Sequence, residues 1–288
     1  MAHSEDSYYI PHGTYWPIIG SIGLFTLMLG FATMLNGWSG GSTVLVIGIL
    51  IVVGMMFLWF GGVIRESESG VFNHQVDISF RWGMGWFIFS EVMFFAAFFG
   101  ALWYARVLSV PWLGGSGSNF ATNEVIWPAF EAVWPTNGPG IVGGKFNIIP
   151  AWGIPAINTA ILLSSGVTVT FAHWALKANQ RGRLLFWMLA TIGLGVFFLY
   201  LQYLEFAEAY GHLNLTLGSG VYGSTFFMLT GFHGMHVTIC FIMLTVIMLR
   251  CAKGHFKPDQ HFAFEGVAWY WHFVDVVWLG LFIFVYWL

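Results

Sequence analysis

Glu91 is the side chain whose chemistry fits its surroundings least. It is the only charged residue among the 24 that lie between Arg81 and Arg106. An apolar run of this length spans the hydrocarbon core of a bilayer as a helix. Because Glu91 follows Arg81 by ten residues, it lies about 15 Å along that helix, near the middle of the membrane. A carboxylate at this depth costs several kcal/mol unless it is protonated, paired or hydrated, so we expect other side chains to shelter it.

Two pairs of ionisable residues fall within other apolar segments. His233 and His236 form one pair, and His272 and Asp275 form the other. Each pair has i, i+3 spacing, which places both members on one face of a helix. Counted along their helices, these residues approach the depth of Glu91. We therefore expect all five side chains to point inward as a buried polar cluster, paired with one another, with hydroxyl groups or with lipid headgroups.

The stretch TGFHGMH, which holds His233 and His236, has a spacing that helical metal sites also use. A closed metal or haem site needs more ligands, and the sequence has no Cys-x-x-Cys motif. We therefore interpret both residues as satisfied histidines of a helix bundle and predict neither metal ligands nor catalytic residues in this chain. The adjacent Gly231 and Gly234 are expected to permit close helix packing.

A proton wire would need polar groups from one membrane face to the other. The ionisable residues cluster near the midplane instead, so a stand-alone proton channel or transporter with Glu91 as its ion site is the less favoured alternative. Glu205 and Glu208 fall at the end of an apolar segment, where we expect a solvated helix end. His173 also falls near a segment end, where we expect an interfacial residue.

The composition sets the class of protein. Of 288 residues, 58% are hydrophobic and only 8% are charged, whereas a soluble domain carries about 25% charged residues. The chain is therefore predicted to be an all-α, polytopic membrane protein. A net charge of −3 gives no reason to expect a nucleic-acid partner. Cys240 and Cys251 lack metal-motif spacing and are not expected to form a disulfide framework.

Seven segments are apolar and long enough to be transmembrane helices. They cover roughly residues 16–35, 43–64, 81–106, 155–176, 184–204, 221–249 and 264–288. The short NGWSGGS joint after the first segment predicts an antiparallel hairpin. Residues 65–80 are polar enough to leave the membrane. A long loop, 109–155, is rich in Gly, Pro and Trp, and loops of this length often cover a partner or a site.

Basic residues indicate how the chain is oriented. With the N-terminus inside, the inner segments hold eight of the ten Lys and Arg residues, and the outer segments hold Arg106 and Lys145. This asymmetry favours both the seven-span count and an N-terminus inside with the C-terminus outside.

Two groups of residues at the inner loops could contact lipid headgroups. Arg250, Lys253, His255 and Lys257 form a basic rim, which either anchors the helix by charge or binds anionic headgroups. A second group, at the other inner loop, could complete a headgroup site and consists of Trp59, Arg65, Glu66 and His74.

Several stretches resemble subunit III of cytochrome c oxidase, in the haem-copper oxidase family. They are SEVMFF around Glu91, INTAILLSSGVTVTFAH from Ile157, GVYGSTFFMLTGFHGMH from Gly220 and FEGVAWYWHFVDVVWL from Phe264. The resemblance covers nearly the whole chain. Related quinol oxidases have a third subunit that lacks the first two spans, so their presence here favours the cytochrome c type over the quinol oxidase alternative.

The resemblance implies a non-redox accessory subunit of a proton-pumping aa3-type oxidase. Haem a, haem a3 and copper would reside in partner subunits, with direct docking on subunit I, subunit II in the same complex and cytochrome c as the electron donor. Residues 1–80 would hold the first two helices and residues 81–288 a five-helix bundle. The two parts would splay apart around a cleft filled with phospholipid.

The resemblance also implies roles for particular residues. Glu91 would face the cleft, Arg65 would meet lipid phosphate, and Trp59, Glu66, His74 and Arg250 occupy neighbouring positions. The subunit would stabilise subunit I and support its proton uptake. The long loop favours a bacterial inner membrane over a mitochondrial one.

Overall fold

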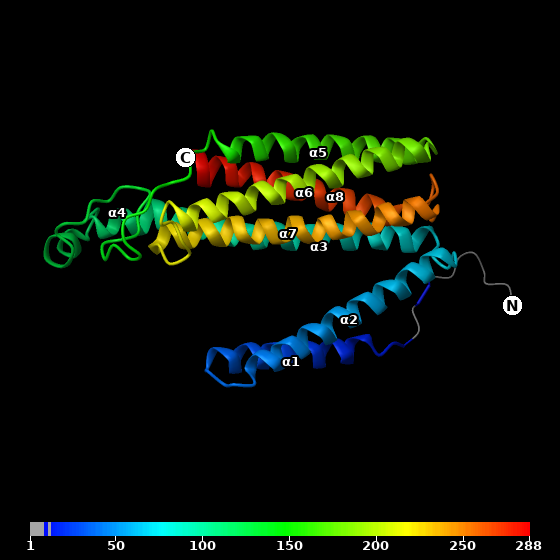
Figure 1. The fold of residues 1–288 in the computed structure, drawn as a ribbon, viewed down its shortest axis with the longest axis horizontal. Coiled ribbons are helices and arrows are strands. Elements are labelled where there is room, and N and C mark those ends of the chain that lie inside the picture. Colours follow the sequence, from blue (N-terminus) through cyan, green and yellow to red (C-terminus); the bar gives the residue numbers. More distant parts are fainter. Residues whose placement is uncertain (1–8, 11–12) are drawn as a thin grey trace. The chain divides into compact units, whose positions relative to one another are not determined.

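A computed structural model describes residues 9–10 and 13–288, and this part of the chain is all-helical (Figure 1). Seven of its helices are long and apolar enough to cross a membrane, as predicted. The bounds of the long helices are α1 Trp16–Leu35, α2 Gly41–Glu68, α3 His74–Tyr104, α5 Ile154–Lys177, α6 Arg181–Gly211, α7 Gly220–Lys253 and α8 Phe262–Leu281.

Local sequence signals set several of these helix ends. Pro17 and Pro155 occupy the first turns of α1 and α5, where a missing N–H costs nothing. Helix α7 stops at Gly254, whose φ of +80° suits a left-handed cap. Helix α2 continues beyond the predicted apolar span to Glu68, because polar residues such as Arg65 and Glu66 are good helix formers outside the hydrocarbon.

The chain divides into two compact units, Met1–Phe80 and Arg81–Leu288. The first holds the antiparallel hairpin of α1 and α2, as the NGWSGGS joint predicts. The two backbones approach closely at three glycines. A Cβ atom added to Gly30, Gly41 or Gly48 would lie within 2.5 Å of backbone atoms of the opposite helix. Side chains are excluded at these points, so the hairpin depends on small residues.

In the second unit, α5, α6, α7 and α8 pack against one another, and α3 joins α7 and α8 through its side chains. Helix α8 is the most buried of the spans in the described part of the chain. Its Trp271 and Trp278 are fully enclosed and donate hydrogen bonds of 2.9 Å to Ser165 and Thr159 of α5. The two ends of the second unit are named by their residues. We call the end where Arg81 lies the Arg81 end, and the end where Arg106 meets Leu288 the Leu288 end.

The predicted loop 109–155 begins as helix. The chain continues from α3 through a π-helical turn, Ala105–Ser109, into the short helix α4, Val110–Leu113. The later part lies over the connection between α6 and α7. Asn214 donates to the carbonyl groups of Gly143 and Lys145, and Phe146 stacks on Tyr222. This segment therefore covers the Leu288 end of the second unit.

Candidate functional site

The side chain that pairs with Glu91 is that of His236 on α7. The carboxylate Oε2 of Glu91 lies 2.7 Å from Nε2 of His236. The His236 side chain is only 6% exposed, whereas that of Glu91 is 20% exposed. Rings of Phe94 and Phe95 lie beside the imidazole. The pair thus joins α3 to α7 near the middle of both helices, with Glu91 at the edge of the bundle.

The hydrogen bonds of His236 define how many protons the pair holds. Its Nδ1 lies 2.6 Å from the carbonyl oxygen of Phe232, which can only accept, so Nδ1 carries a proton. The short Nε2–Oε2 contact then needs one further proton, located on either the imidazole or the carboxyl group. The pair can therefore shelter the acid either as a neutral carboxyl group or as an ion pair.

His233 has a different partner from that of His236. Its Nε2 donates to the carbonyl oxygen of Val274 in α8 over 3.1 Å, and its ring packs against Phe198 and Trp278. One histidine thus faces α8 and the other α3. The ring nitrogens of His233 and His236 point toward different helices. They therefore do not converge on one position where both could bind the same metal ion.

The second predicted pair is only partly buried. Asp275 is buried, but the His272 side chain is 46% exposed and reaches Asp275 over 3.7 Å and Thr170 over 3.3 Å. The expectation that all five polar side chains point inward is therefore wrong for His272. A three-residue step offsets the two side chains by roughly 60°, so both are buried only where neighbouring helices cover both directions. This holds for His233 and His236 but not for His272.

Gly166 of α5 makes room for Asp275. A Cβ atom added there would lie 2.3 Å from Oδ2 of Asp275 and 3.4 Å from Nδ1 of His272. By contrast, nothing in the described chain lies within 4 Å of a Cβ added at Gly231 or Gly234. The close helix packing predicted at those two glycines is wrong, and the close approach occurs at Gly166 instead.

Gly166→Ala is expected to destabilise the second unit by about 1–3 kcal/mol, because Asp275 and α5 must move apart. The measurement is unfolding of the purified chain in a detergent mixture, followed by tryptophan fluorescence. Gly193→Ala is the matched control, since a Cβ atom on Gly193 meets nothing within 4 Å. Equal losses of stability in the two variants would contradict this account.

Comparison with known proteins gives a single result over the whole chain. The family model for cytochrome c oxidase subunit III matches residues 6–288. Cytochrome c oxidase subunit 3 of Marchantia polymorpha is 40% identical over 273 residues, which cover 94% of this chain and 92% of that protein. The protein of the same name from Formosania lacustris is 39% identical over 288 residues, with 100% and 99% covered.

The chain belongs to the cytochrome c oxidase subunit III family. It is accordingly a multi-pass membrane subunit of a respiratory oxidase complex, in agreement with the resemblance found in its sequence. Subunit III is not the member of that complex that carries the haem groups or the redox metal.

One polar cluster of this subunit III chain was missed from the sequence. Glu205 is buried, not solvated as predicted, and its Oε1 accepts hydrogen bonds from Tyr286 over 2.5 Å and from Gln202 over 3.2 Å. Glu208 is exposed. The i, i+3 spacing of Gln202 and Glu205 in the sequence indicated that the two side chains lie on the same face of the helix.

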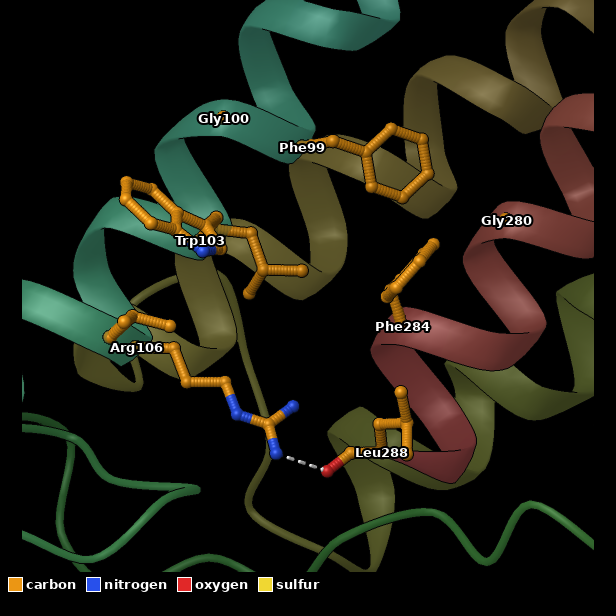
Figure 2. Close-up of a pocket in the computed structure, with 9 residues that line it drawn as sticks. Phe99, Gly100, Trp103, Arg106, Gly280, Phe284 and Leu288 are labelled. Atoms are coloured by element: carbon orange, nitrogen blue, oxygen red, sulfur yellow. Dashed lines mark hydrogen bonds between the residues drawn. The ribbon is translucent and has the colours of Figure 1, made fainter.

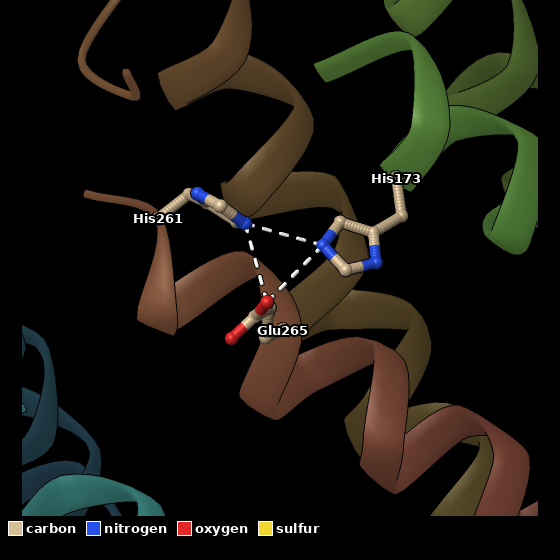
Figure 3. Close-up of side chains that lie close together, drawn as sticks. All are labelled: His173, His261 and Glu265. Atoms are coloured by element: carbon tan, nitrogen blue, oxygen red, sulfur yellow. Dashed lines mark hydrogen bonds and ion pairs between the residues drawn. The ribbon is translucent and has the colours of Figure 1, made fainter. Parts of the chain in front are cut away.

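A second missed cluster lies at the Arg81 end. His173 of α5 was expected at the membrane interface, but it meets His261 and Glu265 at the start of α8 (Figure 3). Arg81 of α3 pairs with the same glutamate. The i, i+4 spacing of His261 and Glu265 was visible in the sequence, whereas the approach of His173 depends on how α5 packs on α8.

The residues predicted to bind lipid differ in accessibility. In the first unit Trp59, Arg65 and His74 are exposed and Glu66 is half-buried. In the second unit Lys253 is exposed. Arg250 is buried, and its guanidinium lies over the ring of Phe256 at 4.6 Å. The exposed members are therefore the ones that an incoming headgroup would meet first.

Figure 2 shows an apolar groove of about 520 Å³ at the Leu288 end, between α3 and the segment that follows α8. Phe99, Trp103 and Phe284 line it, and Arg106 donates a 2.6 Å hydrogen bond to the carbonyl oxygen of Leu288. Apart from Arg106, this lining is apolar and offers van der Waals contact to hydrocarbon.

Proposed function

We propose that this chain is the non-redox accessory subunit III of a proton-pumping aa3-type cytochrome c oxidase. It docks directly on subunit I, with subunit II in the same complex and cytochrome c as the electron donor. Haem a, haem a3 and copper reside in those partners. The observation that carries the proposal is that the carboxylate of Glu91, near the midplane, is paired with His236 of the same chain. Its Oε2 lies 2.7 Å from Nε2 of His236. This pair links two helices of one subunit.

We propose further that the subunit binds phospholipid. Support comes from exposed basic and aromatic residues in each unit, namely Trp59, Arg65 and His74 in the first and Lys253 in the second. Glu66 and Arg250 are near neighbours in sequence of Arg65 and Lys253, respectively. Around Glu91 the outer face of α3 is apolar and exposed, with Trp86 at 66% and Met93 at 55%. Acyl chains can therefore contact the helix that carries the acid. The splay of the first two helices around a lipid-filled cleft stays a prediction from the family resemblance.

Arg65→Ala tests lipid binding. We expect the purified complex to retain less phospholipid, measured as phosphorus per haem after detergent exchange, because the headgroup loses its cationic partner. Lys145→Ala is the control, because this residue lies in the segment that covers the Leu288 end of the second unit. Equal lipid retention in wild type and Arg65→Ala would remove this residue from the proposed site.

Support for proton uptake by subunit I is the second functional proposal. In a Glu91→Gln complex we expect oxygen reduction to continue at close to the initial wild-type rate, because the redox chemistry lies in other chains. We expect proton uptake during sustained turnover to decline sooner. Oxygen consumption and proton uptake are recorded together in vesicles. Complete loss of turnover in a normally assembled complex would contradict an accessory role.

We propose an N-terminus inside and a C-terminus outside. In the second unit the Arg81 end carries most of the basic residues, including Lys177, Arg181 and Lys253, which supports this sense. The relatives named above come from a plant and an animal, which suggests a mitochondrial rather than the predicted bacterial membrane. Oxidation of reduced cytochrome c by the purified complex would distinguish it from a quinol oxidase.

A further inference from the structure

Three side chains at the Arg81 end converge on one point within the second unit. His173 comes from the last turns of α5, while His261 and Glu265 come from the start of α8 (Figure 3). Their side chains are 23%, 6% and 11% exposed, respectively. Neither the oxidase chemistry nor the proposed lipid binding uses this group.

The spacing of the three converging atoms matches one face of a tetrahedral metal site. Nε2 of His173 and Nε2 of His261 are 3.2 Å apart, and they lie 3.3 Å and 3.2 Å from Oε1 of Glu265. Zinc binds imidazole nitrogen and carboxylate oxygen at about 2.0–2.1 Å in tetrahedral sites, which puts neighbouring ligand atoms about 3.3 Å apart. A Zn²⁺ ion could therefore bind all three atoms with little movement of the side chains.

The hydrogen bond on the other side of His261 favours the same reading. Its Nδ1 lies 3.2 Å from the carbonyl oxygen of Lys257, so Nδ1 carries the proton and donates. In the neutral ring, Nε2 then keeps its lone pair, directed at His173 and Glu265. Metal-binding histidines commonly donate their second N–H to a backbone carbonyl in this way, which fixes the tautomer and the ring orientation.

The two oxygens of Glu265 have separate partners. Arg81 pairs with Oε2, while Oε1 faces the two histidines. This division leaves one oxygen for monodentate metal binding and holds the carboxylate in place. The positive charge of Arg81 opposes a nearby cation, so we expect moderate rather than extreme affinity.

We propose that His173, His261 and Glu265 form a divalent metal site that binds zinc, with a water molecule as the fourth ligand. An ion there would tie the end of α5 to the start of α8 and would stabilise the folded chain by mass action. The site carries no electrons, since Zn²⁺ is redox-inactive, and it is therefore separate from the haem and copper centres of the complex.

The test compares zinc binding by the assembled oxidase in four forms, namely wild type, His173→Gln, Glu265→Gln and His212→Ala. Both ligand variants keep polar groups of similar size. His212 is an exposed histidine at the end of α6, so His212→Ala controls for the loss of any imidazole. Bound Zn²⁺ is measured by equilibrium dialysis and elemental analysis, with aa3 haem as the measure of complex concentration.

We expect wild type and His212→Ala to bind one more zinc ion per complex than either ligand variant. Equal zinc content in all four forms would overturn the proposal. If a ligand variant fails to assemble, anomalous diffraction from zinc-soaked wild-type oxidase decides the matter. A zinc peak within bonding distance of all three side chains would support the site, and no peak there would refute it.

Discussion

Gly48→Leu is expected to separate α1 from α2, and it is the stability effect that we expect to be largest. A Cβ atom on Gly48 would lie 2.4 Å from the backbone nitrogen of Leu27 and 2.5 Å from its Cα atom. Backbone atoms cannot turn away as a side chain can, so the helices must part along their length. We expect a cost at or above the upper end of the usual range for overpacking, about 3 kcal/mol.

Spin labels placed at Ile18 and Phe57, both exposed, report the separation of the two helices. The distance between labels should lengthen and broaden in Gly48→Leu. Gly54→Leu is the matched control on the same helix, because a Cβ atom there meets nothing within 4 Å. An unchanged distance distribution in Gly48→Leu would show that the close backbone approach does not hold the hairpin together.

His236→Leu is the second substitution for which we expect a large effect. It leaves Glu91 without its imidazole partner in a half-buried position near mid-helix, which costs about 1–3 kcal/mol. Glu91→Leu should likewise leave Nε2 of His236 unsatisfied. The double variant should cost less than the sum of the two single variants, because no orphaned polar group remains.

A double-mutant cycle measures this coupling, using unfolding of the purified chain followed by tryptophan fluorescence. Thr238→Val serves as a control on α7, since this exposed hydroxyl bonds only to Gly234 of its own helix among the described residues. Strictly additive effects of the Glu91 and His236 substitutions would mean that the 2.7 Å contact contributes nothing to stability.

The sequence was sufficient to predict the spans and the need for a partner at Glu91. Apolar length determines both the number and the approximate ends of transmembrane helices, because the thickness of the hydrocarbon is fixed. Counting residues along the helices also placed His236 at a depth approaching that of Glu91, and the two side chains do meet. Both predictions depend only on distance along the helix axis, which follows directly from the number of residues.

The errors arise from the direction in which each side chain points around its helix. Glu205 lies near a helix end, but it faces inward onto Tyr286. His272 is at the correct depth, yet it lies at the edge of the bundle. Gly231 suggested close packing, although nothing in the described chain approaches it. These directions depend on how neighbouring helices pack, and span hydropathy carries little information about that.

The burial of α8 has a consequence for biogenesis. Helix α8 and the turn that follows it, Phe282–Trp287, are synthesised after α5, α6 and α7, yet they supply Trp271, Trp278 and Tyr286, which donate hydrogen bonds to Ser165, Thr159 and Glu205. Until this segment leaves the translocon, the Ser165 and Thr159 hydroxyl groups still donate to carbonyl groups of α5, but among the described residues Glu205 has only the amide of Gln202 in its own helix. The nascent helices α5 to α7 therefore carry one incompletely paired carboxyl group until α8 and the turn after it insert among them.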